Sequence, residues 1–403
     1  MRISTNTMYN TGSARMSDLQ SSLNKTQLQM TAGKRILSPS DDPVASAQAL
    51  ELKQSQSINE QYATNRSSAK SSLGMEENAL QSITLLLQDV KTIAVNAGNG
   101  VLDSDQRKYF ATELSGRYDE LLALANSRDG AGNYIFAGYQ TTTQPFTKTP
   151  TGASYSGDQG ERILQVGPQR QMALSDSGSI VFESNRTGNG TFVSAATGTN
   201  AGSGVISPGS VVNSAAFTGK NYTISFTDAT TFDIIDNSDP LAPITISPGN
   251  AFVSGQAIVF DGVQIDITGA PAAGDSFTVE PSKNESIFTA LKDLINLLNQ
   301  PATDSTTKAN LTNGLNAAHA SLDSALDSVL TVRSSVGARL KELDSLDAQG
   351  EDRDISYATA LSNLEDLDYT KAITDFSKQK IMLEAAQQAF VKTTGLSLFN
   401  YIS

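Results

Sequence analysis

The chain has 403 residues, no Cys, one His and a formal net charge of −13. Without Cys it has no disulfide, thiolate metal site or cysteine nucleophile, and a histidine-based triad or metal site would depend on His319, which the helical pattern places at an exposed or boundary position. The acidic balance argues against nucleic acid and anionic membranes as ligands, because phosphate binding needs clustered Lys and Arg.

The two ends of the chain have a helical pattern, whereas the middle does not. Apolar residues recur at spacings of three and four in residues 1–145 and 284–403, and the stretch between them is rich in Gly, Ser and Thr. This arrangement predicts an α+β, multidomain fold, with a long coiled-coil-like helical rod formed by both termini and an inserted antiparallel β domain. A rod built from the chain's own ends indicates assembly, and we expect no enzymatic activity.

The first predicted helix carries only a thin apolar stripe: Met16, Leu19, Leu23 and Met30, with Thr26 in the gap. Such a helix needs a packing partner, because its own propensity gives marginal stability. Gly33 is expected to end it. The turn at 38–43 then leads into a second helix, with Asp42 as N-cap and Pro43 at the first helical position.

The second helical pattern runs from Val44 to about Ala97 and stops at Asn99-Gly100. Asp103 and Gln106 have the spacing of a capping box, which predicts the start of a third helix. Residues 134–136, Tyr-Ile-Phe, follow as a short apolar, strand-like segment.

The C-terminal half mirrors this organisation. A dense apolar stripe at 287–298 ends before Pro301, and residues 311–343 then step by fours and threes in a helix of roughly 40 residues, or ~60 Å. A polar break is predicted at 350–356. The last helical run extends to Phe390, with Gly395 as the expected C-cap.

The middle of the chain has the signals of a small antiparallel β domain. Alternating apolar residues begin at Tyr222, and Asp261-Gly262 between two apolar runs indicates a hairpin whose turn requires positive φ angles. The Gly/Ser/Thr-rich stretch 193–210 is predicted to be a mobile loop. Asp228, Asp233 and Asp236 lack EF-hand or repeat spacing, so we expect no metal there. The sequence has no P-loop, GxGxxG or HExxH motif, and we expect no cofactor.

Several motifs recur in order along the helical ends: MRISTNTMY at 1–9, TAGKRILSPSDDPVA at 31–45, IAVNAGNG at 93–100, LANSRDG at 124–130, NYIFAG at 133–138, LEAAQQAF at 383–390 and GLSLFNY at 395–401. Together they resemble the bacterial hook-associated proteins of the flagellin superfamily, in particular the type found at the hook-filament junction. The resemblance covers roughly 260 residues, and the middle of the chain shares only short patterns at 155–158 and 269–279.

The resemblance implies an extracellular structural component of the bacterial flagellum. Such proteins leave through the flagellar type III export channel without a cleaved signal peptide, and residues 1–7 have no apolar h-region. The expected partners are a hook-side junction protein, flagellin, further copies of the chain in a ring, and an export chaperone at the C-terminal helix, about 360–403. Neither nucleic acid nor membrane insertion is expected.

The resemblance also divides the chain. We expect residues 1–40 and 365–403 to form a terminal coiled coil, 41–145 and 284–364 a helical bundle, and 146–283 an outer β domain. The subunit interface is predicted to involve apolar residues of the terminal coiled coil: Leu19, Leu23, Met30, Leu383, Phe390, Leu396, Leu398 and Phe399.

The sequence leaves several alternatives open. The apolar C-terminal tip either folds back as ordinary core or stays loosely ordered until subunits associate, and the thin stripe of the first helix favours the second interpretation. Filament flagellin would differ by forming long polymers unaided. An adhesive β domain and an enzyme that uses paired carboxylates, which need no His, are the other classes.

Overall fold

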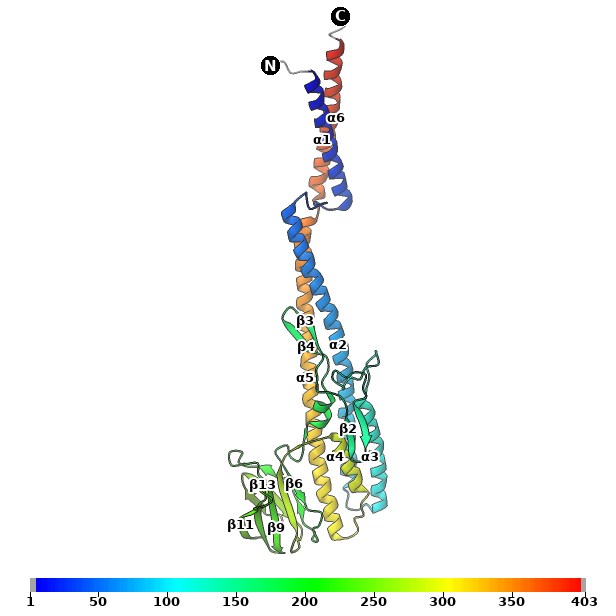
Figure 1. Cartoon of the computed structure of the whole chain (residues 1–403). Helices are drawn as coiled ribbons and strands as arrows, with labels where there is room; N and C mark the ends of the chain where they lie inside the picture. Colours follow the sequence, from blue (N-terminus) through cyan, green and yellow to red (C-terminus); the bar gives the residue numbers. More distant parts are fainter. Residues whose placement is uncertain (1–4, 400–403) are drawn as a thin grey trace. The chain divides into compact units, whose positions relative to one another are not determined.

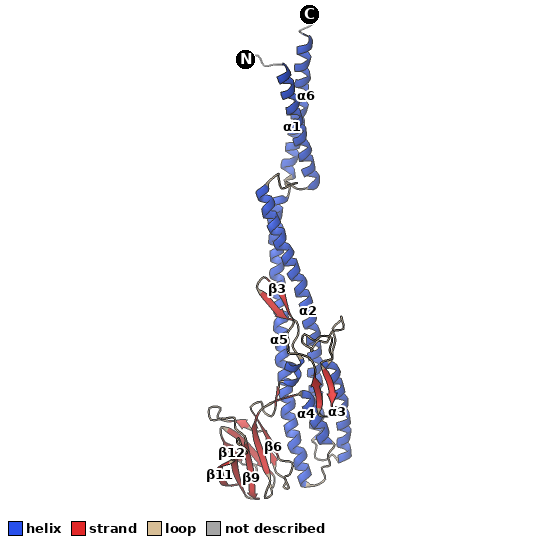
Figure 2. Ribbon diagram, viewed as in Figure 1, coloured by secondary structure: helices blue, strands red, loops and turns tan. Residues whose placement is uncertain are grey.

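The structure, a computed structural model, describes the backbone of residues 5–399 and the side chains of residues 7–393 (Figure 1). The chain forms two compact units: one comprises Met1–Thr64 and Ser345–Ser403, and the other comprises Asn65–Asp344. Helices α2 (Pro43–Ala97) and α5 (Ser305–Glu365) contribute to both units. The predicted α+β class, with paired terminal helices and an inserted antiparallel β region, is confirmed (Figure 2).

In the first unit, helices α1 (Thr5–Ala32) and α6 (Tyr369–Phe399) lie side by side (Figure 1). Gly33, at φ +66°, follows α1 in a conformation that favours glycine, which confirms the predicted helix end. Pro43 is the first residue of α2, and the Asp42 carboxylate accepts the Ala45 backbone N–H at 3.1 Å, as predicted for an N-cap.

Two predicted helix ends are wrong. Helix α5 continues through the expected polar break at 350–356 and ends at Glu365. Gly350 is buried there, and its carbonyl accepts a hydrogen bond from the Asn59 side chain of α2 at 2.9 Å, so packing between the helices outweighs the local polarity. Gly395 is not a C-cap, because α6 runs on to Phe399. A single Gly costs a helix only about 1 kcal/mol, which is too little to end it.

The helices of the second unit follow the sequence pattern closely. Helix α3 (Ser104–Ala125) starts with the predicted capping box between Asp103 and Gln106, and α4 is Ile287–Leu298. The apolar heptad residues of α2 are fully buried against their neighbours: Leu73, Leu80, Ile83, Leu87 and Val90. These contacts supply the stability that helical propensity alone does not.

Short irregular elements cover the helices. Residues 134–136 are buried but form no strand, which corrects the prediction; Tyr134 makes a single isolated bridge with Arg128. The chain then forms β1 (Phe146–Thr149), β2 (Gly152–Tyr155), β3 (Ile163–Gly167), β4 (Arg170–Ala173), a π-helical turn η1 (Ser179–Glu183), β5 (Asn185–Arg186) and, after the β region, β15 (Asn284–Glu285). Antiparallel pairs join β1 with β2, β3 with β4 and β5 with β15.

The inserted β region consists of two antiparallel sheets around one apolar core. The larger sheet has the order β11-β10-β9-β14-β6 and the smaller one β12-β13-β7, with β8 also pairing β13. Their bounds are β6 (Phe192–Ala196), β7 (Val205–Ile206), β8 (Ser210–Val211), β9 (Tyr222–Asp228), β10 (Thr231–Asp236), β11 (Ile244–Ala251), β12 (Ala257–Phe260), β13 (Val263–Thr268) and β14 (Ser276–Pro281). The hairpin at Asp261-Gly262 is confirmed, with φ angles of 45° and 74°.

The expected mobile loop at 193–210 is instead ordered by strands β6, β7 and β8. Asp275, only 1% exposed, accepts the backbone N–H groups of Ala201 at 2.7 Å, Gly202 at 3.0 Å and Ala272 at 2.9 Å. One buried carboxylate therefore fixes a glycine-rich segment whose composition alone predicts flexibility.

Candidate functional site

The paired terminal helices are the first candidate surface. Hydrogen bonds fix an antiparallel register: the Thr26 hydroxyl donates to the Gln379 side chain at 3.0 Å, and the Tyr369 hydroxyl donates to the Met30 carbonyl at 3.2 Å. Extending this register places Leu19 at the level of Leu383.

An aromatic contact closes the outer part of this pair. The rings of Tyr9 and Phe390 lie 5.2 Å apart, and a Cβ added to Gly12 would come within 2.8 Å of the Phe390 ring. Gly12 thus lets α6 approach α1 closely. Sequence reasoning missed both Tyr9 and Gly12, although a Gly inside a predicted helix is a signal of close packing.

The structure places five of the eight predicted interface residues in this pair. Leu19, Leu23 and Met30 on α1 and Leu383 and Phe390 on α6 are all half-buried. The side chains of Leu396, Leu398 and Phe399 lie outside the described residues. The interface role of all eight stays a prediction.

The described part of the α1–α6 pair has almost no core of its own. Only Thr26 and Ala372 are buried among the described side chains of the two helices. Large apolar side chains are instead exposed: Met8, Tyr9, Leu28, Tyr369, Ile373, Ile381, Met382 and Val391. The pair therefore buries little of its apolar surface within the single chain.

A polar joint follows the pair, where α1 leads to α2 and α5 leads to α6. The Arg35 backbone N–H donates to the Glu365 carbonyl at 2.7 Å, and the Leu367 N–H donates to the Gly33 carbonyl at 3.0 Å. Side chains add to this: Glu365 pairs with both Lys34 and Lys53. The joint is therefore held by hydrogen bonds and ion pairs between residues that lie more than 300 positions apart in the sequence.

Charge interactions keep the carboxyl groups of the joint ionised. The Lys25 side chain, 2.7 Å from Asp41, together with the N–H groups of Ser38 and Leu37, lowers the pKa of Asp41 to about 2. Lys53 and then Lys34 lower the pKa of Glu365. These groups stay negatively charged through the neutral range.

Replacing Glu365 by Gln is expected to loosen this joint. The substitution removes two ion pairs, each worth about 0.2–1 kcal/mol, so α1 and α6 should exchange amide hydrogens faster. Because the pKa of Glu365 is lowered in the fold, its stabilisation is present above its ordinary value and is lost as the pH falls through the folded value. Hydrogen exchange at pH 7 and 3.5 tests this. Glu351→Gln, an exposed position of α5, is the control, and equal exchange in both variants would contradict the role of Glu365.

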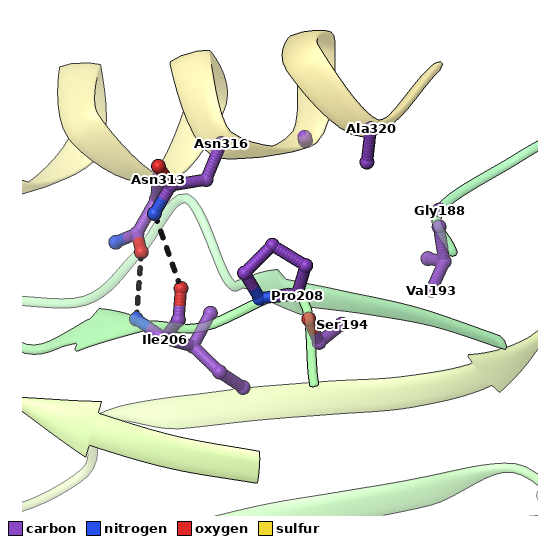
Figure 3. A pocket seen from close by; sticks show the side chains of 9 residues that line it. Gly188, Val193, Ser194, Ile206, Pro208, Asn313, Asn316 and Ala320 are labelled. Atoms are coloured by element: carbon purple, nitrogen blue, oxygen red, sulfur yellow. Dashed lines mark hydrogen bonds between the residues drawn. The ribbon is translucent and has the colours of Figure 1, made fainter. Parts of the chain in front are cut away.

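A second candidate surface is the seam between α5 and the inserted sheets (Figure 3). The Asn313 side chain accepts the Ile206 N–H at 2.9 Å and donates to the Gly204 carbonyl at 3.0 Å. The Asn316 side chain donates to the Ile206 carbonyl at 3.4 Å. The asparagines thus bond the free edge of strand β7, beside a cavity of about 10 Å³.

Asn313→Ala is expected to release strand β7 locally. It leaves the Ile206 N–H of β7 and the Gly204 carbonyl just before the strand without their partner, at a cost of about 1–3 kcal/mol. The Ile206 amide should then exchange hydrogen faster, while amides of the central strand β9 keep their protection. Asn316→Ala, which removes only the longer bond, is the matched control. Unchanged exchange at Ile206 in Asn313→Ala would refute this assignment.

A buried carboxyl group, Glu76, lies beside the half-buried Asp176 in the second unit. Glu76 is 0% exposed, and its Oε1 accepts the Asp176 N–H at 2.8 Å, while Oε2 has no hydrogen-bond partner among the described residues. Burial, and then the charge of Asp176, raise the pKa of Glu76 to about 8, and Arg339 pairs with Asp176. This pair fastens a loop to α2, and Glu76 itself is closed to solvent, so the pair gives no support to a carboxylate enzyme.

Other chemical features are sparse. His319 is half-buried on α5, and burial lowers its pKa, which disfavours its charged form. Among residues 5–399, no cluster of three or more metal-ligating side chains has a geometry that would hold a metal ion. Within the same range, every helix is too short or too polar to cross a bilayer.

The comparisons with known proteins agree with the sequence motifs. Residues 3–141 match the bacterial flagellin N-terminal helical region, and residues 320–402 match the C-terminal helical region. Residues 195–281 match the D2-like domain of flagellar hook-associated protein 1.

Individual relatives match over nearly their whole length. Flagellar hook-associated protein 3 of Salmonella typhimurium is 31% identical over 399 residues, which is 99% of each chain. The flagellar junction protein FlgL of Legionella pneumophila is 34% identical, with a TM-score of 0.70, over 79% of this chain and 100% of its own. FlgL of Xanthomonas campestris is 30% identical, with a TM-score of 0.72, over 77% and 99%. The chain therefore belongs to the flagellar hook-associated protein 3 (FlgL) family of the flagellin superfamily.

Proposed function

We propose that this protein is a structural adaptor of the bacterial flagellum, where it joins the hook-side junction protein to the flagellin filament. The similarity spans 99% of the chain and of a hook-associated relative, including the inserted β region. This full-length match carries the proposal, and it favours a junction protein over filament flagellin. The role is structural rather than enzymatic.

The α1–α6 pair is the proposed assembly element. It exposes apolar side chains along both helices and buries only two described ones, so association would supply the burial that the single chain lacks. In the assembled state, residues 1–40 and 365–403 would form the inner coiled coil, 41–145 and 284–364 the bundle around it, and 146–283 the outer domain. Further copies would complete a ring.

Export and partners complete the proposal. The chain would leave the cell through the flagellar type III channel without a cleaved signal peptide, and a chaperone would hold the C-terminal helix, about 360–403, before export. On one side the ring would meet a FlgK-like junction protein, and on the other side the first flagellin subunits.

The proposal predicts a defined position for the protein. Immunogold microscopy with antibody against residues 146–283 should label one narrow band between hook and filament. Label along the filament would instead mean flagellin, and label away from flagella would contradict the flagellar role. An adhesive function of the β region would be indicated if its removal abolished surface binding but spared motility.

A paired substitution tests the assembly element. Phe390→Asp with Leu398→Asp should block incorporation at the junction while the inserted sheets stay folded, because charges replace apolar side chains of the predicted contact. The control is Val101→Asp, at a side chain that is 89% exposed in the loop before α3. Normal incorporation of the double variant would contradict the role of these residues.

A further inference from the structure

A groove between α2 and α5 lies in the first unit. Its volume is about 450 Å³, and it is lined by Gln56, Glu60, Asp354, Ile355 and Ala358. Ile355 is 66% exposed, and Oδ1 of Asp354 is buried without a hydrogen-bond partner among the described residues. A buried carboxylate oxygen of this kind lacks the donor that such groups normally have. The groove thus combines an exposed apolar side chain, Ile355, with two acidic lining residues, Glu60 and Asp354.

The charge of this unit is divided between its two parts. The α2 and α5 segments at 43–64 and 345–365 contain seven acidic and two basic residues, a net charge of −5. Helices α1 and α6, at 5–32 and 369–399, contain six basic and three acidic residues, a net charge of +3. In a chain of net charge −13, the terminal pair is thus the basic element, and the groove lies in an acidic segment.

Helix α6 presents a surface that complements the groove. Ile373 is 51% and Ile381 is 66% exposed, and Lys380 is exposed beside them. Lys380 and Ile381 follow Ile373 by seven and eight positions, about two helical turns, so both lie on the side of the helix that carries Ile373. This face offers apolar side chains and an ammonium group, whereas the groove offers Ile355 and two carboxylates.

The two surfaces of one chain lie on different sides of the joint (Figure 1). Ile381 is about 18 Å along α6 from Tyr369, and Asp354 is about 16 Å along α5 from Glu365, at 1.5 Å per residue. The bonds of the joint hold α1 and α6 as a separate pair beyond that point. A second copy of the chain is therefore the occupant that has the matching charge.

We propose that the groove receives the Lys380–Ile381 face of α6 from a neighbouring copy, with the Lys380 ammonium group against Asp354 and Glu60. The inference rests on the proposed function, to which it adds which surfaces meet. Because groove and occupant are different surfaces, the contact is heterologous and repeats from copy to copy around a ring or along a helix.

Thiol cross-linking tests the contact directly, because the chain has no Cys of its own. The full-length chain carrying Ile355→Cys and Ile381→Cys replaces the natural copy in cells, and isolated flagella are treated with a short bismaleimide. We expect a ladder of cross-linked multimers. A chain with Leu241→Cys and Ile381→Cys is the control, since Leu241 is 96% exposed in the β region. The inference would be overturned if the chain were found at the junction by immunogold labelling but gave no ladder of cross-linked multimers, or if the test and control chains gave equal ladders. Either result would leave the junction role intact.

Charge reversal gives a second test. Asp354→Lys and Lys380→Glu should each lower incorporation about tenfold, because like charges then meet, and the two substitutions combined in one chain should restore it. Both side chains lie on exposed or half-exposed helix surfaces, and circular dichroism of each purified variant checks that the helices are retained. Failure of the combination to restore incorporation of folded chains would refute the pairing. Absence of the unaltered protein from the junction would instead refute the proposed function.

Discussion

Glu76→Gln is expected to stabilise the second unit at alkaline pH and to flatten the pH dependence of its unfolding. The folded protein raises the pKa of Glu76 from 4.5 to about 8 because the carboxyl group is buried and faces Asp176. Its contribution to stability is therefore full below 4.5 and is lost as the pH rises through the folded value. At about 1.4 kcal/mol per unit of pKa, the difference sets an upper bound of about 5 kcal/mol.

Gln suits this position because it keeps an acceptor for the Asp176 N–H and adds an amide donor without charge. Urea unfolding at pH 5, 7 and 9 measures the free energy of unfolding of both chains. Hydrogen exchange at the Asp176 amide is a second, local measurement. Glu77→Gln is the matched control: this neighbour is half-buried and pairs with Arg333 at 2.6 Å, so its loss should destabilise at all three pH values. If Glu76→Gln kept the pH slope of the unaltered chain, the buried carboxyl group would not be its source.

Phe288→Ala is expected to cost about 3–5 kcal/mol of unfolding free energy, the usual range for removing a buried ring. Phe288 is 0% exposed, and its ring centroid lies 5.1 Å from Phe146, 5.7 Å from Phe182 and 5.8 Å from Tyr118. These rings come from α3, α4, β1 and η1, so one cavity weakens four elements at once.

The loss should appear as a lower urea midpoint in circular dichroism, with the inserted sheets keeping their own hydrogen-exchange protection. Tyr109→Ala on α3, at a side chain that is 74% exposed, is the control and should change stability by less than about 0.5 kcal/mol. A loss below about 1 kcal/mol for Phe288→Ala would show that the aromatic cluster repacks around the gap.

Helices and hairpins could be predicted because their signals are local. The capping box at Asp103, the Pro43 start and the Asp261-Gly262 turn depend on residues within a few positions of one another. Two of the errors are explained by distant contacts. Gly350 stays helical because α2 packs against it, and residues 193–210 are ordered because Asp275 binds their backbone.

The candidate surfaces divide in the same way. Apolar spacing found Leu19, Leu23, Met30, Leu383 and Phe390, since each lies on a repeating helix face. Apolar spacing could not identify the partner of Thr26, the ring contact over Gly12 or the asparagines that bond β7. These contacts depend on how two distant segments align, and the sequence of one segment alone does not determine that alignment. For Glu76, the sequence showed a polar residue within an apolar heptad pattern but gave no sign that its carboxyl group is buried.

The antiparallel α1–α6 register has a consequence for the order of folding. The contact of Thr26 with Gln379 joins residues 353 positions apart, so forming the pair costs the conformational entropy of closing a long loop. The pair buries few side chains, so little hydrophobic burial offsets this cost. On the ribosome α1 is made more than 300 residues before α6, the helix it pairs with. The α1–α6 pair is thus expected to form after the second unit and to open before it, which leaves the two helices accessible while the second unit is already folded.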